Sequence, residues 1–218
     1  MKPVIVFGIS NFAKMLYIIS KSINNVQVEA FLVDDEYYTD NEFCGLPVWR
    51  FSDLNHNMIE TYDFLICVGY KKMRSRKIIF DKLSEKGCNF INFIHPSVTI
   101  LPEVNIGKNN ILLANVTIEN NVNIGDNNVF WSQSLIAHDS IVCNHNFFAP
   151  RTVIAGHCVI GNLCFFGVNS FIVDNIKVSD ETYLIAGSGL FKNTELYTRY
   201  GGNPARKIDS HEKTGICI

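Results

Sequence analysis

The sequence predicts a small α/β domain followed by a parallel β-helix, and two observations carry the prediction. From residue 95 to residue 190 the chain falls into sixteen consecutive hexads in one register, each with a bulky apolar residue at its sixth position. Before residue 95, short apolar runs alternate with segments of helical apolar spacing. A six-residue unit is too short to bury its apolar face alone, so successive units must coil and stack on their neighbours.

The α/β domain is expected over residues 1–94. Residues 3–7 form an apolar run followed by helical spacing, which predicts a buried strand, a tight loop and a helix. Further strands are predicted at residues 28–35, 62–69 and 89–94, with a loop around residues 45–48 and an amphipathic helix over 73–86 that ends at Gly87. Parallel strands of this kind bind ligands at their carboxyl ends.

That edge carries the candidate ligand residues of the first domain. The loop after the first strand has only one of the three glycines of a dinucleotide fingerprint, so a structural turn without a ligand and a helix N-terminus that holds a phosphate oxygen both remain open. The two acids at the end of the second strand either accept hydrogen bonds from a sugar or base, or are solvated loop acids. Basic residues 71–77 are expected to form a solvated helix face. The candidates are Gly8, Ser10, Asn11, Asp34, Asp35, Gly69 and Tyr70.

The β-helix is expected over residues 95–190, with a C-terminal tail over 191–218. A period of six suits three short strands per turn, so eighteen residues make one coil and residue i lies under residue i+18 at about 4.8 Å. Small residues directly after the buried one, such as Gly107 and Gly125, and many asparagines are expected to mark the corners. The period does not reveal the hand of the winding. The sixth-position residues are Ile100, Ile106, Leu112, Ile118, Ile124, Phe130, Ile136, Val142, Phe148, Ile154, Ile160, Phe166, Ile172, Val178, Leu184 and Leu190.

Composition excludes several classes of protein. The formal net charge of −2 gives no sign of nucleic-acid binding, and no apolar run is long enough to span a membrane. The first residues lack the pattern of a signal peptide, so a cytoplasmic protein is expected.

The seven cysteines are odd in number and scattered, which favours free thiols in a reducing compartment. The alternative of a zinc site between subunits would resemble the hexapeptide carbonic anhydrases, whose ligand histidines lie on equivalent positions two coils apart. No two histidines of this β-helix are 36 residues apart, so no metal is expected.

His138 is the candidate general base. It lies two residues after the inward Ile136, at a corner, so its ring should point outward, and Asp139 can orient it or stabilise its protonated form. One coil further on lies Gly156, whose backbone N–H should be one sheet spacing away with no side chain to block a substrate carbonyl. A base and a bare amide donor are the two groups that acyl transfer requires. The alternative is that His138 is simply an exposed corner residue.

Nearly the whole chain resembles the sugar O-/N-acyltransferases of the sialic-acid O-acetyltransferase (NeuD) group. Within that group it is most similar to the PglD-type N-acetyltransferases of nucleotide-linked 4-amino-4,6-dideoxysugars. The resemblance rests on the first strand and its loop, the paired acids, the segment 93–98, the hexads with residues 137–139, and the closing residues 202–206. It implies a Rossmann-like N-terminal domain and a left-handed β-helix of hexapeptide repeats, with His138 as base, Asp139 as its acid and Gly156 as the donor to the thioester carbonyl.

The resemblance also implies the ligands and the assembly. Acetyl-CoA would be the co-substrate, and the N-terminal candidates would hold the nucleotide-sugar. Three chains would form a homotrimer with active sites between subunits. The groove that receives acetyl-CoA would be lined by Gly156, Asn175, Ala186, Gly187, Lys192 and Arg206.

The chain departs from this pattern at Phe147, where the type enzyme has a second histidine. His145, two places earlier, should face another way. The expected activity is acetyl-CoA-dependent N-acetylation of a UDP- or dTDP-linked 4-amino-4,6-dideoxyhexose for lipopolysaccharide or other surface glycan biosynthesis. The alternatives are O-acetylation of a sugar hydroxyl, as in the sialic-acid enzymes, and a non-catalytic trimeric scaffold that binds sugar nucleotides.

Overall fold

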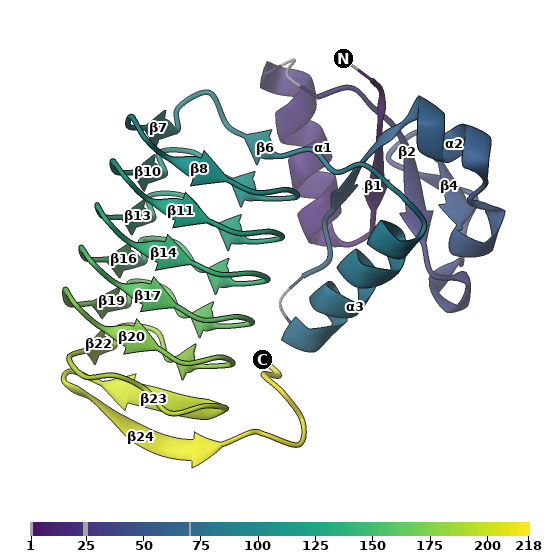
Figure 1. The fold of residues 1–218 in the computed structure, drawn as a ribbon. Helices are drawn as coiled ribbons and strands as arrows, with labels where there is room; N and C mark the ends of the chain where they lie inside the picture. Colours follow the sequence, from purple (N-terminus) through teal and green to yellow (C-terminus); the bar gives the residue numbers. More distant parts are fainter. Residues whose placement is uncertain (1, 24–25, 70) are drawn as a thin grey trace. The chain divides into compact units, whose positions relative to one another are not determined.

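The computed structural model describes residues 2–23, 26–69 and 71–218, and it divides into two units (Figure 1). One unit comprises residues 1–69 and 78–93, and the other comprises residues 70–77 and 94–218. No helix in the described part of the chain is long and apolar enough to cross a membrane.

The first unit is built on a five-stranded sheet in the order β3-β4-β2-β1-β5. All neighbouring strands are parallel except the β3–β4 hairpin. Its strands are β1 (Val4–Phe7), β2 (Val28–Val33), β3 (Glu42–Phe43), β4 (Leu46–Arg50) and β5 (Asp63–Ile66). Its helical segments are α1 (Asn11–Ile23), η1 (Asp35–Tyr37), η2 (Phe51–Asp53), α2 (His56–Thr61) and most of α3 (Met73–Glu85).

The predicted strands at β1, β2 and β5 and the helices α1 and α3 are confirmed. Helix α3 ends at Glu85, and Gly87 terminates it as expected: its φ of 84° is left-handed, and the N–H of Cys88 donates to the carbonyl of Leu83. The predicted loop at residues 45–48 is wrong, because Cys44 and Gly45 form a two-residue hairpin turn with φ of 56° and 80°. The predicted strand at 89–94 is wrong in extent: only a bridge at Phe90 joins the first sheet.

The second unit is a parallel β-helix with three sheets, and its stacked coils are visible in Figure 1. One sheet contains β7 (Thr99–Ile100), β10 (Thr117–Ile118), β13 (Leu135–Ile136), β16 (Val153–Ile154), β19 (Phe171–Ile172) and β22 (Gly189–Leu190). The second contains β8 (Asn105–Ile106), β11 (Asn123–Ile124), β14 (Ile141–Val142), β17 (Val159–Ile160) and β20 (Lys177–Val178). The third contains β6 (Phe93–Ile94), β9 (Ile111–Leu112), β12 (Val129–Phe130), β15 (Phe147–Phe148), β18 (Phe165–Phe166), β21 (Tyr183–Leu184), β23 (Thr198–Gly202) and β24 (Ala205–Ser210).

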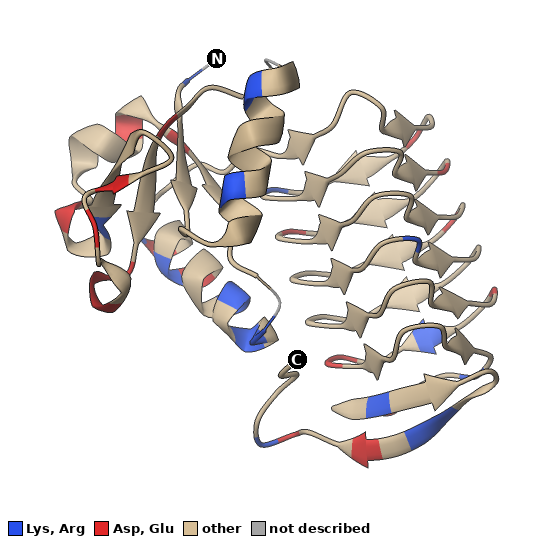
Figure 2. Cartoon of the chain, turned by 180° about the vertical axis from the view of Figure 1, so that it is seen from behind, with Lys and Arg blue, Asp and Glu red and all other residues tan. Residues whose placement is uncertain are grey.

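The eighteen-residue register of the β-helix is confirmed. Leu135 pairs with Thr117 on one side and with Val153 on the other. The sixth-position residues from Leu112 to Leu190 are all buried, and they form one apolar core with stacked phenylalanines. Ile100 and Ile106, in the first coil, are the exceptions: Ile100 is 40% exposed and Ile106 is partly buried, because their strands end their sheets and no coil covers them from above. Lys177 is the one charged residue in the two-residue strands of the coils. The other charged residues of the β-helix unit lie mainly at corners and on β23 and β24 (Figure 2).

The third hexad position, rather than the first, has left-handed backbone. Every third-position residue from Glu103 to Gly187 has φ between 52° and 70°. The small first-position residues have a different cause from the one expected: a Cβ on Gly125 would lie 2.3 Å from the side-chain oxygen of Asn144 on the next coil. Glycine is required there by the close approach of two coils, and not by the backbone angle.

The prediction that the basic residues of 71–77 form a solvated helix face is wrong for Arg74 and Arg76. Arg76 is fully buried, and its Nη2 donates to the backbone and side-chain oxygens of Asn127 at 3.0 and 2.9 Å. The Nε of Arg74 donates to the carboxylate of Glu181 at 3.0 Å. This segment is therefore an anchored part of the β-helix unit.

The stacked phenylalanine core predicts a large loss of stability on truncation. Phe148 is fully buried, and its ring centroid lies 4.6 Å from that of Phe130 and 4.8 Å from that of Phe166. We expect Phe148→Ala to lower the free energy of unfolding by about 3–5 kcal/mol in urea titrations, because it loses apolar burial and leaves a cavity. Leu196→Ala, at a residue 53% exposed, is the control. A loss for Phe148→Ala no larger than that of the control would contradict this account of the core.

Candidate functional site

One corner of the β-helix stacks four polar residues on successive coils. Asn121, Asp139, His157 and Asn175 are each eighteen residues apart, and all have left-handed backbone with φ of 56° to 62°. The N–H of His157 donates to the carbonyl of His138 at 3.0 Å, which ties two of these coils together. The side chains of the column therefore project in the same direction, one above another.

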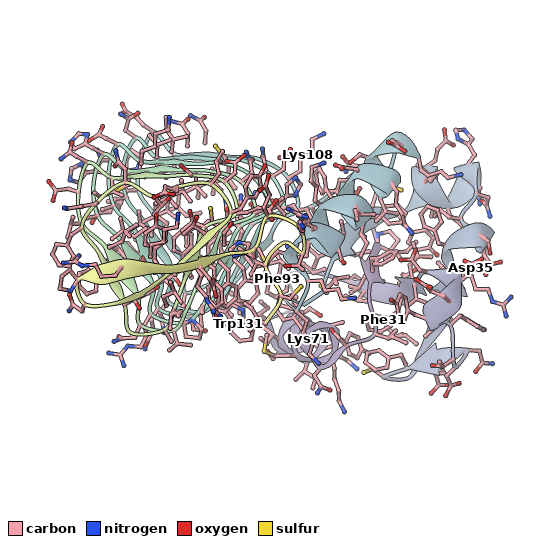
Figure 3. All side chains as sticks on the ribbon, turned by 90° about the horizontal axis from the view of Figure 1, so that it is seen from below. Phe31, Asp35, Lys71, Phe93, Lys108 and Trp131 are labelled. Atoms are coloured by element: carbon pink, nitrogen blue, oxygen red, sulfur yellow. The ribbon has the colours of Figure 1, made fainter. Side chains whose placement is uncertain are left out.

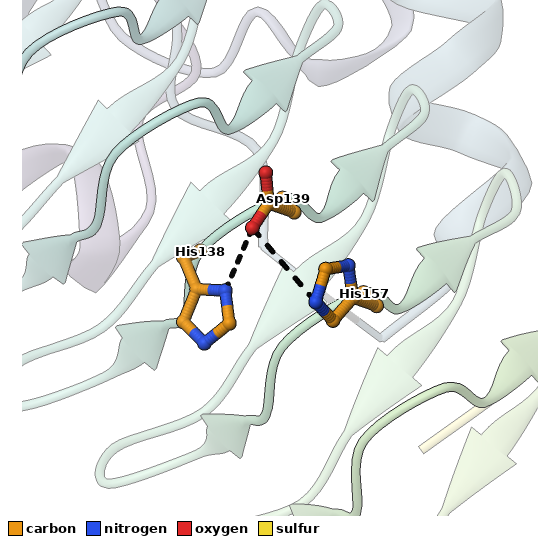
Figure 4. A group of neighbouring side chains, drawn as sticks. All are labelled: His138, Asp139 and His157. Carbon is orange, nitrogen blue, oxygen red and sulfur yellow. Dashed lines mark hydrogen bonds and ion pairs between the residues drawn. The ribbon is translucent and has the colours of Figure 1, made fainter.

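His138 projects outward from this corner, as the sequence predicts, with 46% of its side chain exposed. Its Nδ1 lies 2.8 Å from Oδ2 of Asp139 (Figure 4). The other oxygen of Asp139 accepts a hydrogen bond of 2.6 Å from the side-chain amide of Asn121. The hydrogen bond from Asn121, followed by that from His138, lowers the pKa of the Asp139 carboxyl from its ordinary value. Asp139 is therefore an ionised, oriented acceptor for the imidazole.

Gly156 lies directly against the ring of His138. A Cβ on Gly156 would be 2.7 Å from Cε1 and 2.9 Å from Nε2 of that ring, so only glycine leaves room for it. Within the described residues, no protein group accepts a hydrogen bond from the N–H of Gly156. The corresponding N–H one coil earlier, that of His138, donates to the carboxylate of Glu119 at 3.0 Å. The expected pairing of an imidazole with a bare amide on adjacent coils is thus present.

This geometry provides an acid–base group and an anion donor side by side. When Nδ1–H of the neutral His138 ring donates a hydrogen bond to Asp139, Nε2 carries the lone pair and can accept a proton. The N–H of Gly156 can donate to an oxygen that becomes negative. Proton removal next to a carbonyl that is being attacked is therefore within the capacity of this corner.

His157 is the residue of this corner that the sequence analysis missed. Its Nε2 lies 3.9 Å from Oδ2 of Asp139, and its ring is edge-on to that of His138 at 5.2 Å between centroids. The sequence does predict this neighbour, because His157 follows Asp139 by eighteen residues and therefore lies beside it on the next coil. The ligand atoms of His138, Asp139 and His157 all lie within 4.8 Å of one another, and these three residues form the group in the described chain that could hold a metal ion.

Phe147, where the type enzyme has a second histidine, and His145 both face away from this corner. Phe147 is buried and stacks on Phe165, with 5.4 Å between ring centroids. His145 is buried too, and its Nδ1 lies 2.9 Å from the side-chain amide of Asn127. Neither side chain is available beside His138, as expected for His145.

The candidates of the first unit gather at the carboxyl ends of its parallel strands. Gly8 follows β1 with φ of 116°, and a Cβ there would lie 3.2 Å from the carbonyl oxygen of Cys67. Ser10 stands before helix α1, and its hydroxyl accepts from the N–H of Ala13 at 3.4 Å. Asn11 begins that helix, and Gly69 follows β5. Tyr70 lies outside the described residues.

The paired acids of the first unit both have protein partners. Asp34 forms an ion pair with Lys82, which also lies 3.9 Å from the ring centroid of Phe51. Asp35 lies at the surface, whereas Phe31 of the same strand region is buried (Figure 3). The carboxylate of Asp35 accepts from the backbone N–H of Ser52 at 3.0 Å, and this hydrogen bond lowers the pKa of Asp35. Lys82 is a cation that the sequence analysis did not assign to this edge.

The remaining candidates are not brought together within one chain. Asn175 belongs to the same column as His157. Ala186 and Gly187 stand at another corner, where the N–H of Gly187 donates to the carbonyl of Val168 at 2.8 Å. Lys192 and Arg206 are exposed, the first after β22 and the second on β24. Two surface depressions lie elsewhere, along residues 209–217, and the one that Tyr183 and Arg199 also line has a volume of about 160 Å³.

Comparison with known proteins supports the fold. The family described as bacterial transferase hexapeptide (six repeats) matches residues 103–138. No curated protein matches the chain. PerB from Caulobacter crescentus, solved in complex with CoA and GDP-perosamine, is 21% identical with a TM-score of 0.85, over 96% of this chain and 98% of that chain.

Two structures of another protein are similar to the same extent. The acetyltransferase domain of PglB from Neisseria gonorrhoeae is 20% identical with a TM-score of 0.84, over 95% of this chain and 100% of that chain. The same domain in complex with acetyl coenzyme A is 19% identical with a TM-score of 0.82, over 95% and 99% of the two chains. Together with the hexapeptide match, these similarities show the fold: this chain has a left-handed β-helix of hexapeptide repeats.

The hydrogen bond from Asn121 predicts a specific change in the titration of Asp139. We expect Asn121→Gly to raise the pKa of Asp139, because it removes the largest cause of the lowering while glycine keeps the left-handed backbone. The carboxyl carbon of Asp139 can be followed by NMR as a function of pH. Asn175→Gly is the matched control, since its side chain contacts Asp174 and not Asp139. An unchanged or lower Asp139 pKa in Asn121→Gly would refute this assignment.

Proposed function

We propose that this chain is an acetyl-CoA-dependent N-acetyltransferase that acts on the 4-amino group of a nucleotide-linked 4-amino-4,6-dideoxyhexose. The observation that carries the proposal is the outward imidazole of His138, oriented by Asp139 and stacked against the unpaired N–H of Gly156. Its support from comparison is the likeness, over nearly the whole chain, to a protein solved with CoA and GDP-perosamine.

The chemistry follows from the three groups. Nε2 of His138 takes a proton from the amine as its nitrogen attacks the thioester carbonyl, and Asp139 stabilises the imidazolium that forms. The N–H of Gly156 donates to the carbonyl oxygen while it is anionic. The new C–N bond remains, the C–S bond breaks, and the thiolate of CoA leaves and is protonated.

We assign the nucleotide of the sugar to the first unit. We propose that this unit binds it as Rossmann-like domains do, at the carboxyl edge of the parallel sheet. Gly8, Ser10 and Asn11 place a helix N-terminus at the carboxyl edge of the sheet, a position suited to a phosphate. Asp34 and Asp35 offer acceptors for a sugar hydroxyl or a base, and Gly69 leaves open space beside them. Lys82, paired with Asp34, adds a cation to the same edge.

A homotrimer with active sites between subunits completes the proposal. Ala186 and Gly187 stand at a different corner from His138, so a single acetyl-CoA groove can include all of them only if two chains contribute. The outer faces of two sheets carry exposed apolar residues that a neighbouring chain would cover, namely Ile141, Val153 and Val159 at 45%, 38% and 38% exposed. Asn175, Lys192 and Arg206 would contact pantetheine and the CoA phosphates. We place the reaction in the cytoplasm, in surface glycan biosynthesis.

The base assignment predicts a large kinetic effect. We expect His138→Ala to lower kcat/KM for the amino-sugar nucleotide by roughly 10²–10⁴-fold, because a general base contributes about that much. Release of the CoA thiol measures the rate. His56→Asn, which removes an exposed histidine of the first unit, is the control. Near wild-type kcat/KM in His138→Ala would show that another group takes the proton.

The glycine assignment predicts loss of rate without loss of fold. Gly156 does not have left-handed backbone, so alanine fits its main chain but its Cβ must push the ring of His138 aside. A displacement of about 1 Å at a reacting group can cost on the order of 10²-fold, and we expect kcat of Gly156→Ala to fall by about that factor. The thermal midpoint should be nearly unchanged. Full activity in the folded variant would separate Gly156 from the reaction.

The choice of acceptor distinguishes this activity from O-acetylation. Amino-sugar nucleotides carrying UDP, dTDP or GDP should release CoA thiol, whereas free sialic acid and the matching 4-hydroxy sugar nucleotides should not. The amine is the stronger nucleophile, and only a nucleotide-linked acceptor uses the edge of the first unit. Turnover of sialic acid alone would favour the O-acetyltransferase alternative. No thiol release with any acceptor would favour the non-catalytic scaffold.

A further inference from the structure

We propose that His138, Asp139 and His157 form a binding site for a divalent transition-metal ion of the zinc class, and that this ion switches off the base. Two imidazoles and a carboxylate are ligands that suit zinc, nickel and copper. Their ligand atoms lie within 4.8 Å of one another on two adjacent coils (Figure 4). The site is inhibitory rather than catalytic, and its effect on rate rests on the proposed function.

The carboxylate at the centre of this site is already oriented. Oδ1 of Asp139 is held by the side-chain amide of Asn121 at 2.6 Å, which directs Oδ2 toward both imidazoles. Oδ2 lies 2.8 Å from Nδ1 of His138 and 3.9 Å from Nε2 of His157. A second residue that fixes a metal-binding carboxylate in this way is a usual feature of metal sites.

Small side-chain movements bring the three atoms to coordination geometry. Ligand atoms bound to one tetrahedral zinc ion lie about 3.4 Å apart, given bonds of about 2.0–2.2 Å. The two separations from Asp139 Oδ2, 2.8 and 3.9 Å, bracket this value, and all three ligand atoms lie within 4.8 Å of one another. His138 and His157 have 46% and 53% of their side chains exposed, so both rings are free to shift while the coil backbone keeps its register. Water or another ligand would fill the remaining position.

Metal binding at Nδ1 of His138 conflicts with its role as a base. In the tautomer that acts as a base, Nδ1 donates its hydrogen bond to the Asp139 carboxylate and Nε2 holds the lone pair. A metal ion takes the Nδ1 lone pair, so the ring proton must move to Nε2 through solvent. Nε2 then has no lone pair with which to accept the proton of the amine. The ion thus inhibits by fixing the wrong tautomer, even where it does not block the substrate.

Zinc titration of the whole chain tests this site without any substrate. Isothermal titration at pH 7.5 should give one zinc ion per chain, and His157→Asn should weaken that binding by at least about 10-fold. Asparagine is the matched replacement, because the same column already has it at Asn121 and Asn175 with left-handed backbone. His56→Asn, outside the cluster, should leave the affinity unchanged. Lowering the pH should weaken binding, because protons compete for the imidazoles.

Equal zinc affinity in wild type and His157→Asn, or the absence of stoichiometric binding, would overturn the site. Zinc should also inhibit thiol release in wild type, with the inhibition constant raised by the same factor in His157→Asn relative to its own zinc-free rate. The binding measurement tests the metal site, and the rate measurement tests the base assignment, so the two claims can be contradicted independently. If zinc binds as expected and the rate is unaffected, the base assignment of His138 under the proposed function is contradicted, while the metal site stands.

Discussion

The structure of the second unit depends on the vertical spacing of its coils. Each strand residue pairs with the residue eighteen positions away, so a side chain in the inner coils has a defined neighbour above and below. The left-handed third position of each hexad makes this possible, since it turns the chain sharply after each two-residue strand. Apolar residues fill the interior, glycine relieves close contacts between coils at positions such as Gly125, and the corner side chains of the column from Asn121 to Asn175 project outward.

The candidate chemistry occupies one of those corners because a corner aligns side chains without burying them. At the column from Asn121 to Asn175, the same geometry that stacks a structural asparagine also stacks an acid and an imidazole. His138 and Gly156 precede two members of that column, and their contact is a consequence of register rather than of a special loop. The coil spacing therefore sets the distance between base and amide donor before any ligand binds.

Much of this could be predicted from the sequence because the register is exact in the hexads. The position of His138 on the outside, its pairing with Asp139 and its contact with Gly156 all follow from counting residues. The same arithmetic would have found His157 beside Asp139, had it been applied to the acid as well as to the base. The β3–β4 hairpin was missed because proline and glycine near residue 45 resemble loop composition, although two left-handed residues there make a tight turn.

Other features depend on long-range contacts that no local pattern encodes. Arg76 lies in a segment rich in lysine and arginine, yet it is buried because Asn127, fifty-one residues away, supplies two acceptors. Lys82 has an ordinary place on an amphipathic helix, and only the structure shows it paired with Asp34. Ala186 and Gly187 stand at a second corner, which a single chain does not bring to His138. The pairings of Arg76 and Lys82 are polar contacts between distant parts of the chain, about which periodicity carries no information, whereas the corner of Ala186 and Gly187 follows from the hexad period.

The most direct test of the account is a crystal structure with CoA and an amino-sugar nucleotide bound. In that complex we expect the acceptor amine to lie about 2.6–3.2 Å from Nε2 of His138, with the sulfur of CoA on the side of Gly156. An amine held by another side chain, out of hydrogen-bond reach of His138, would contradict the central claim that this corner of the β-helix is where the acyl group is transferred.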